Sequence, residues 1–273
     1  MMKRFVVISV LLSFLVGTVL VVAGCGPNAE QIAKNAMRAD SKIKTVHAKF
    51  ATKQVLPRAP IQQGQVAKKV FTTESEGDFD LRTGDWRVRQ ELASGVMVTG
   101  LWVDDKYYNE IAGNWYQMPS SMQPASPVSK TLSISQYLKY FKSLEKMGDA
   151  KIDGEACFHL QAVPSMKDLI KLPGITDLLK DPATGQQLRT VDELSDLKGI
   201  FDIFIRKSDS FWKRTQAYIE MRADESLIKL GYAETGDKVK YTAVTTLSRF
   251  NQKLDLQAPA KFQPWPEGQQ PPG

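Results

Sequence analysis

The chain has 273 residues, of which 42% are hydrophobic and 24% charged, and its formal net charge is +6 at pH 7. This is long and apolar enough for one large domain with its own core, or for two small domains. The charge excess is mild and contains no long basic run, so we expect no nucleic-acid partner.

Residues that support common enzyme chemistries are few and scattered. Cys25 and Cys157 are the only cysteines, and His47 and His159 are the only histidines. Metal sites usually gather such ligands at short spacing, and the sequence has no cluster of that kind. It also has no phosphate-binding glycine loop, no HExxH and no GxSxG motif. We therefore predict that the protein is not an enzyme, with no catalytic residues, no metal and no cofactor.

Residues 1–24 have the layout of an export signal. Lys3 and Arg4 form a short basic start, an uncharged apolar run fills 5–23, and Gly24 precedes Cys25. That order is typical of a secretory signal peptide. A run of this length would also just span a bilayer, so an uncleaved anchor and ordinary secretion are the alternatives.

The end of this segment, Val22-Ala23-Gly24-Cys25, resembles the bacterial lipobox. The resemblance implies that residues 1–24 are removed and that Cys25 carries diacylglycerol and a further acyl chain such as palmitate. Two or more acyl chains give stable membrane attachment. We thus expect an extracytoplasmic domain anchored to the cell membrane, with Cys157 left as a buried side chain in a strand.

A helix and a series of strands follow. Residues 29–43 have apolar side chains at helical spacing, and 44–55 alternate as a strand does. Closely spaced strand patterns continue at 66–74, 77–82, 86–92, 96–105, 106–111 and 115–119. Such spacing favours antiparallel meanders over βαβ crossovers.

The middle of the chain changes character. We predict a helix at 134–148, a strand at 156–163, a helix at 166–182 broken at Pro173-Gly174, and a loop at 182–196. Further strands follow at 199–207, 214–222, 226–234 and 238–250, and a Pro-rich disordered tail at 263–273. About ten or eleven strands result. The prediction is an α+β fold: a strongly curved antiparallel sheet, or half-barrel, with helices covering its concave face. We assign it to one domain over 25–262; a split into two domains near 125–131 is the alternative.

Several short phrases in this order carry a family resemblance. They are KTVHAKF at 44–50, Gly113 with Trp115 and Tyr116, Arg206-Lys207-Ser208-Asp209, and Asn251 with Pro259. Over residues 29–262 the chain resembles the LolA/LolB and LppX/LprG superfamily of half-barrel lipoprotein carriers. Relatives often have Asp-Lys-x-Thr where this chain has 206–209. The middle helices also diverge, so the identity of a ligand is not carried over.

The resemblance implies a hydrophobic cavity between sheet and helices that holds acyl chains. Core and cavity use the same side chains, so each candidate for the lining is also a candidate for the core. The candidates are Phe50, Phe79, Trp86, Trp102, Phe141, Phe158, Phe201, Ile203 and Tyr241. The expected function is binding of lipid or lipoprotein acyl chains and their transport across or along the envelope. The alternatives are an envelope sensor that acts through a membrane protein partner, and a structural surface lipoprotein.

Overall fold

The computed structural model describes residues 26–266, except positions 60, 63–64, 67–68, 93–94, 121–131, 142, 166–167, 169–196, 224 and 230. The predicted signal peptide, Cys25, nearly all of the predicted helix at 166–182, the loop at 182–196 and residues 267–273 lie outside the described residues.

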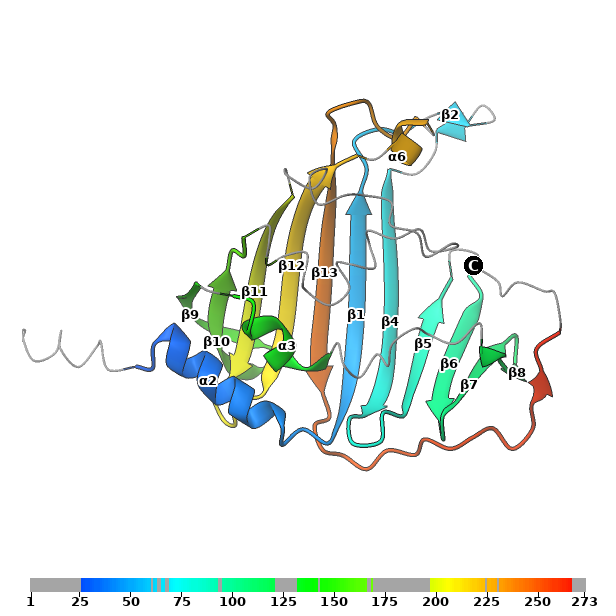
Figure 1. The fold of residues 1–273 in the computed structure, drawn as a ribbon, viewed down its shortest axis with the longest axis horizontal. Helices are drawn as coiled ribbons and strands as arrows, with labels where there is room; N and C mark the ends of the chain where they lie inside the picture. Colours follow the sequence, from blue (N-terminus) through cyan, green and yellow to red (C-terminus); the bar gives the residue numbers. More distant parts are fainter. Residues whose placement is uncertain are drawn as a thin grey trace, which may run out of the picture.

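The described chain forms one large, curved and unclosed sheet with few helices (Figure 1). The helices are α2 (Ala29–Asp40), α3 (Ile134–Leu138) and α6 (Glu225–Lys229). The strands are β1 (Thr45–Val55), β2 (Ile61–Gln62), β3 (Gln65–Val66), β4 (Val70–Asp80), β5 (Trp86–Glu91), β6 (Met97–Val103), β7 (Lys106–Ile111), β8 (Asn114–Gln117), β9 (Leu144–Ile152), β10 (Glu155–Ala162), β11 (Lys198–Arg206), β12 (Trp212–Arg222), β13 (Lys238–Ser248) and β14 (Gln263–Pro264).

The order of the strands joins the two β blocks of the sequence. The 12-stranded sheet runs β14-β8-β7-β6-β5-β4-β1-β13-β12-β11-β10-β9, and β2 and β3 form a separate hairpin. Neighbours are antiparallel, apart from the short parallel pair of β14 with β8. Strand β1 pairs with β4 on one side and with β13 on the other. The predicted half-barrel is confirmed, and the N-terminal and C-terminal strands belong to the same sheet.

The predicted helix at 134–148 is wrong beyond its first turns. Helix α3 ends at Leu138, and Leu144–Ile152 is instead the edge strand β9, paired with β10. The helical spacing of Ile134, Leu138 and Phe141 is nonetheless real, because all three side chains are buried. Strand pairing satisfies the backbone of 144–152, and Gly148 has a φ of 134°, which no helix has. Tertiary pairing thus overrides the local helical pattern.

Three further expectations need correction. The stretch 226–234 was predicted to be a strand, but it contains α6 and its end, where Gly231 has a φ of 77° and the Tyr232 N–H donates to the Leu227 carbonyl. This left-handed glycine closes the helix. The strands predicted at 66–74 and 77–82 join in one strand, β4, which runs from Val70 to Asp80, while Val66 belongs to β3. Residues 263 and 264, predicted to start a disordered tail, form β14.

Asn251 fastens the end of β13 to the start of β1. Its side-chain oxygen accepts the Lys44 N–H at 2.6 Å, and its amide donates to the Lys42 carbonyl at 3.1 Å. Asn251 itself has a φ of 58°, a conformation that asparagine tolerates better than most residues. The chain then leaves the sheet and passes below the ends of β1 and of β4 to β7 before it reaches β14 (Figure 1). We call residues 251–266 the C-terminal strap.

The β4–β5 turn gives a pH-dependent prediction. The Arg82 guanidinium donates hydrogen bonds to the Asp80 carboxylate and holds the pKa of Asp80 below its ordinary value of 3.8. A lowered folded-state pKa stabilises the fold above pH 3.8, and this contribution is lost as the pH falls through the folded pKa. Arg82→Ala should raise the pKa of Asp80, as measured by NMR titration, whereas Arg89→Ala on β5 should not. An Asp80 titration that is the same in both variants would contradict this assignment.

Candidate functional site

The candidate site is the sheet face on which α2 and α3 lie, which we call the inner face (Figure 1). Side chains alternate across a strand, so Val46, Ala48 and Phe50 of β1 face this side, while His47 and Lys49 face the other. Helix α2 buries one stripe on the inner face: Ile32, Ala33, Ala36 and Ala39. The helices therefore cover part of this face and form the core with it.

Asp40 at the end of α2 holds α3 in place. Its carboxylate accepts the Ser133 hydroxyl at 2.5 Å and the Ser135 hydroxyl at 2.8 Å, and the Ser135 N–H donates to it at 3.4 Å. Ser133 occupies the N-cap position of α3 but makes no cap hydrogen bond with its own side chain. Asp40 thus supplies the cap from the neighbouring helix, and a carboxylate there also suits the helix dipole.

The structure brings all nine predicted lining residues into one cluster on the inner face. They divide into two groups by exposure. Five are buried: Phe79, Trp86, Phe141, Phe201 and Ile203. Four are partly buried and pack against the cluster: Phe50, Trp102, Phe158 and Tyr241.

The buried group forms the core beneath the helices. The Phe141 ring from the end of α3 lies 5.2 Å from the Phe201 ring of β11, measured between centroids. Trp86 lies across Gly100 of the neighbouring strand, where an added Cβ would stand 3.1 Å from the indole. Glycine at this position allows the tryptophan to lie flat on β6. These side chains already have protein partners, so their role is packing.

The partly buried group lies beside small side chains that the sequence reasoning missed. Phe50 stands opposite Ser75 on β4 and Thr245 on β13. Ala243 and then Tyr241 follow Thr245 at alternate positions of β13. The Tyr241 hydroxyl accepts a hydrogen bond from the Gln54 amide at 2.8 Å. Small residues at alternating positions (Ser75, Ala243 and Thr245) therefore form a band on the inner face beside larger aromatic rings. The signal for it is the two-residue period of small side chains in adjacent strands, which becomes readable only when the register is known.

Two tyrosines near this face, Tyr137 and Tyr107, have a raised pKa. Burial raises the pKa of Tyr137 on α3 to about 12. Burial also raises the pKa of Tyr107 on β7, against a smaller opposing effect of its hydrogen bond with Asn109. An apolar, uncharged surface of this kind suits a hydrocarbon ligand better than a polar one.

The opposite face explains why β6 is apolar on both sides. Leu101, Val103 and Tyr108 form a second small cluster there, with Trp115 and Leu256 packed against it. Leu256 belongs to the C-terminal strap, and the Phe262 ring of the strap lies 5.2 Å from the Tyr108 ring. Thus the strap covers the outer face at β6 and β7. The apolar residues there need no ligand and no second sheet.

Two further observations concern only the described residues. Among them, no group of three or more His, Cys, Asp and Glu side chains is placed to hold a metal ion. In the same part of the chain, no helix is long and apolar enough to cross a membrane.

No protein-family model matches the sequence, and no curated protein matches it. Among solved structures, LprF from Mycobacterium bovis matches over 86% of this chain and 100% of its own length, with a TM-score of 0.52 at 14% sequence identity. The chain has the same half-barrel fold as LprF.

The half-barrel also matches the lipoprotein LppX from Mycobacterium tuberculosis over 83% of this chain and 96% of that one, with a TM-score of 0.48 at 10% identity. A LolA superfamily protein from Nitrosomonas europaea matches over 84% of this chain and 96% of its own, with a TM-score of 0.27 at 9% identity. At these identities the likeness concerns the fold alone, so the function of the half-barrel has to be argued from its inner face.

Proposed function

We propose that this half-barrel binds lipid or lipoprotein acyl chains on its inner face and carries them across or along the cell envelope. The observation that carries the proposal is the band beside the covered core. There, partly buried aromatic rings alternate with Ser75, Ala243 and Thr245 on a face that is otherwise apolar. Each methylene removed from water contributes about 0.8 kcal/mol, so an acyl chain can bind such a surface without any catalytic group.

We further propose that Cys25 is the membrane anchor. Only Gly26, Pro27 and Asn28 separate it from α2, whose N-terminus is capped by the Asn28 side chain at 2.8 Å. An acylated Cys25 would therefore hold the folded domain close to the bilayer, where lipid ligands are concentrated.

Lipidation of Cys25 is tested directly by metabolic labelling. In a bacterial host fed a labelled fatty acid, the wild-type chain should carry the label and lose residues 1–24. Cys25→Ser should lose the label and keep these residues, while Cys157→Ser, the matched control, should behave as wild type. Label retained in Cys25→Ser would refute the anchor.

Acyl-chain binding is tested on the chain that begins at Gly26, which retains every helix and strand of the structure. Native mass spectrometry of this chain, purified from bacteria, should show bound lipid, and a fluorescent fatty-acyl probe should bind and be displaced by unlabelled fatty acid. A chain that carries no lipid and does not bind the probe would refute the proposed function.

A further inference from the structure

One end of the sheet gathers exposed apolar side chains. Strand pairing brings five strand ends together: the end of β12, the starts of β11, β13 and β4, and the end of β1. Lys198 pairs with Glu220, Arg222 pairs with Lys238, and Val55 pairs with both Lys240 and Val70. Figure 1 shows this end at the top, with α6, away from α2 and α3. Five large apolar side chains lie within four residues of these strand ends or of the end of β10. Each is at least two-fifths exposed: Val70, Phe71, Val163, Ile200 and Tyr218.

We call these five residues the apolar rim. Ile200 and Tyr218 are 42% and 41% exposed and lie on the outer side of the sheet. With Lys198, Glu220 and Lys240 they line an open groove of about 350 Å³. Soluble proteins rarely gather apolar side chains on one exposed edge unless that edge meets a partner.

The charges around the apolar rim indicate the kind of partner. The described carboxylates of β12 and the β12–β13 connection are all paired with cations: Glu220 with Lys238, Glu225 with Lys229, and Glu234 and Asp237 with Arg58. Four exposed lysines have no ion pair with a described residue: Lys53, Lys69, Lys198 and Lys240. The rim therefore places lysines without an ion pair to any described residue next to exposed apolar side chains.

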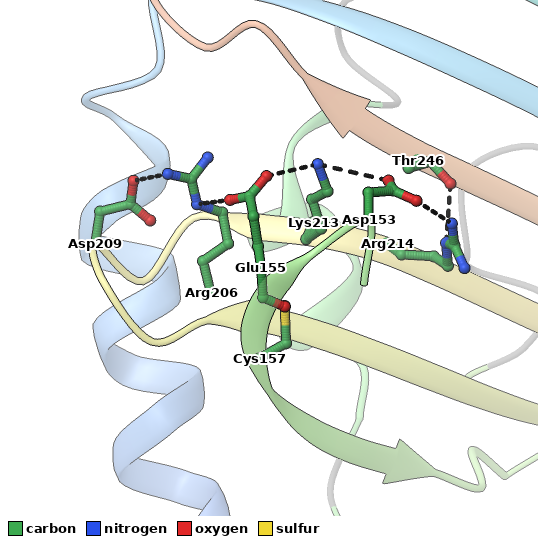
Figure 2. A network of polar contacts seen from close by, with 8 residues as sticks. All are labelled: Asp153, Glu155, Cys157, Arg206, Asp209, Lys213, Arg214 and Thr246. Atoms are coloured by element: carbon green, nitrogen blue, oxygen red, sulfur yellow. Dashed lines mark hydrogen bonds and ion pairs between the residues drawn. The ribbon is translucent and has the colours of Figure 1, made fainter. Parts of the chain in front are cut away.

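The opposite end of the sheet is built differently. Its turns hold a continuous ionic network of Asp153, Glu155, Arg206, Asp209, Lys213 and Arg214 (Figure 2). None of the described large apolar side chains that are exposed lies in these turns. The described turns at this end thus lack the exposed large apolar side chains that gather at the rim.

We propose that the apolar rim docks the half-barrel on a bilayer surface rich in anionic lipid. Exposed aliphatic and aromatic side chains enter the headgroup region, and nearby lysines are attracted to the negative surface potential. This inference adds to the proposed function, since it names the surface at which an acyl chain would enter or leave the inner face. It does not depend on Cys25, because Cys25 precedes α2 in the sequence and α2 lies away from the rim (Figure 1).

The test is flotation of the chain that begins at Gly26 with vesicles. Vesicles of phosphatidylglycerol and phosphatidylcholine in equal parts should bind it, and vesicles of phosphatidylcholine alone should bind it much less. Lys198→Gln with Lys240→Gln should weaken binding about 25-fold, because each lysine near an acidic surface contributes roughly a fivefold effect. Ile200→Ser with Tyr218→Ser should weaken binding at least as much.

The matched control changes two apolar side chains of similar exposure elsewhere, Met147→Ser with Phe262→Ser, at 50% and 45%. It should bind the acidic vesicles as wild type does. Equal losses in the control and rim variants, no preference for acidic vesicles, or burial of the rim in a dimer of this chain in solution would each overturn the proposal. Acyl-probe binding in solution without vesicles reports on the inner face alone. A failed rim and a failed acyl site are therefore distinguished.

Discussion

Phe79→Ala is expected to lower the free energy of unfolding by about 3–5 kcal/mol, the range for loss of a phenylalanine from a packed core. The Phe79 side chain is fully buried, stands between Val46 of β1 and Trp86 of β5, and contacts the Phe50 ring edge-on at 6.0 Å. Truncation leaves a cavity where β1, β4 and β5 meet, at the point that joins the two halves of the sheet. Urea denaturation of the chain from Gly26 measures the change.

The matched control is Phe71→Ala in the same strand and on the same face. Phe71 is 40% exposed, so its truncation should change stability by less than about 1 kcal/mol. If both variants lose the same stability, the core is not centred on β1, β4 and β5. An unchanged slope of the denaturation curve shows that both variants unfold from the same compact state.

Glu155→Ala is expected to cost about 3 kcal/mol, because it leaves a buried lysine without its closest partner. Glu155 accepts a hydrogen bond from the Lys213 ammonium at 2.8 Å and forms an ion pair with the Arg206 guanidinium at 2.9 Å, and Lys213 is only 3% exposed (Figure 2). The next carboxylate, Asp153, lies 3.6 Å from Lys213. The network joins the β9–β10 turn to the β11–β12 turn, so the loss should be seen in global unfolding.

Two comparisons isolate the buried charge. Glu220→Ala breaks an exposed ion pair with Lys238 and should change stability by less than about 1 kcal/mol. Glu155→Leu combined with Lys213→Met removes both charges and should regain most of the loss, because apolar replacement of a buried pair is often neutral. A loss in Glu155→Ala no larger than that in Glu220→Ala would show that the pair is not effectively buried.

The sequence predicted the half-barrel because its main signals are local. Alternating residues marked β1, β5 and β12, and the close spacing of the strand patterns marked the antiparallel arrangement. The errors arose where tertiary contacts, and not local sequence, decide the secondary structure. Residues 144–152 become an edge strand only through β10, and β14 exists only because the strap returns to β8.

The sequence predicted which residues gather at the candidate site, but not which of them are fully packed and which are partly exposed. All nine residues chosen for the lining gather on one face, yet only the register separates the fully packed Phe79 of β4 from the partly exposed Phe50 of the adjacent strand β1. The small residues beside Phe50 have no signal of their own in the sequence. The rim was also missed. Val70, Ile200 and Tyr218 are far apart in the chain and come to the same end of the sheet only through strand pairing.

The central claim is that acyl chains bind on the inner face, and two adjacent positions of β13 test it most directly. Ala243 faces the inner side beside Tyr241 and Thr245, whereas Val244 faces the outer side, and both are partly buried. In the chain from Gly26, Ala243→Trp fills the band, whereas Val244→Trp leaves it open. Affinity for the fluorescent acyl probe should fall at least about tenfold in Ala243→Trp, a loss of about 1.4 kcal/mol, and stay unchanged in Val244→Trp, with both variants folded by circular dichroism. Full probe affinity in folded Ala243→Trp, or equal loss in both variants, would contradict the account.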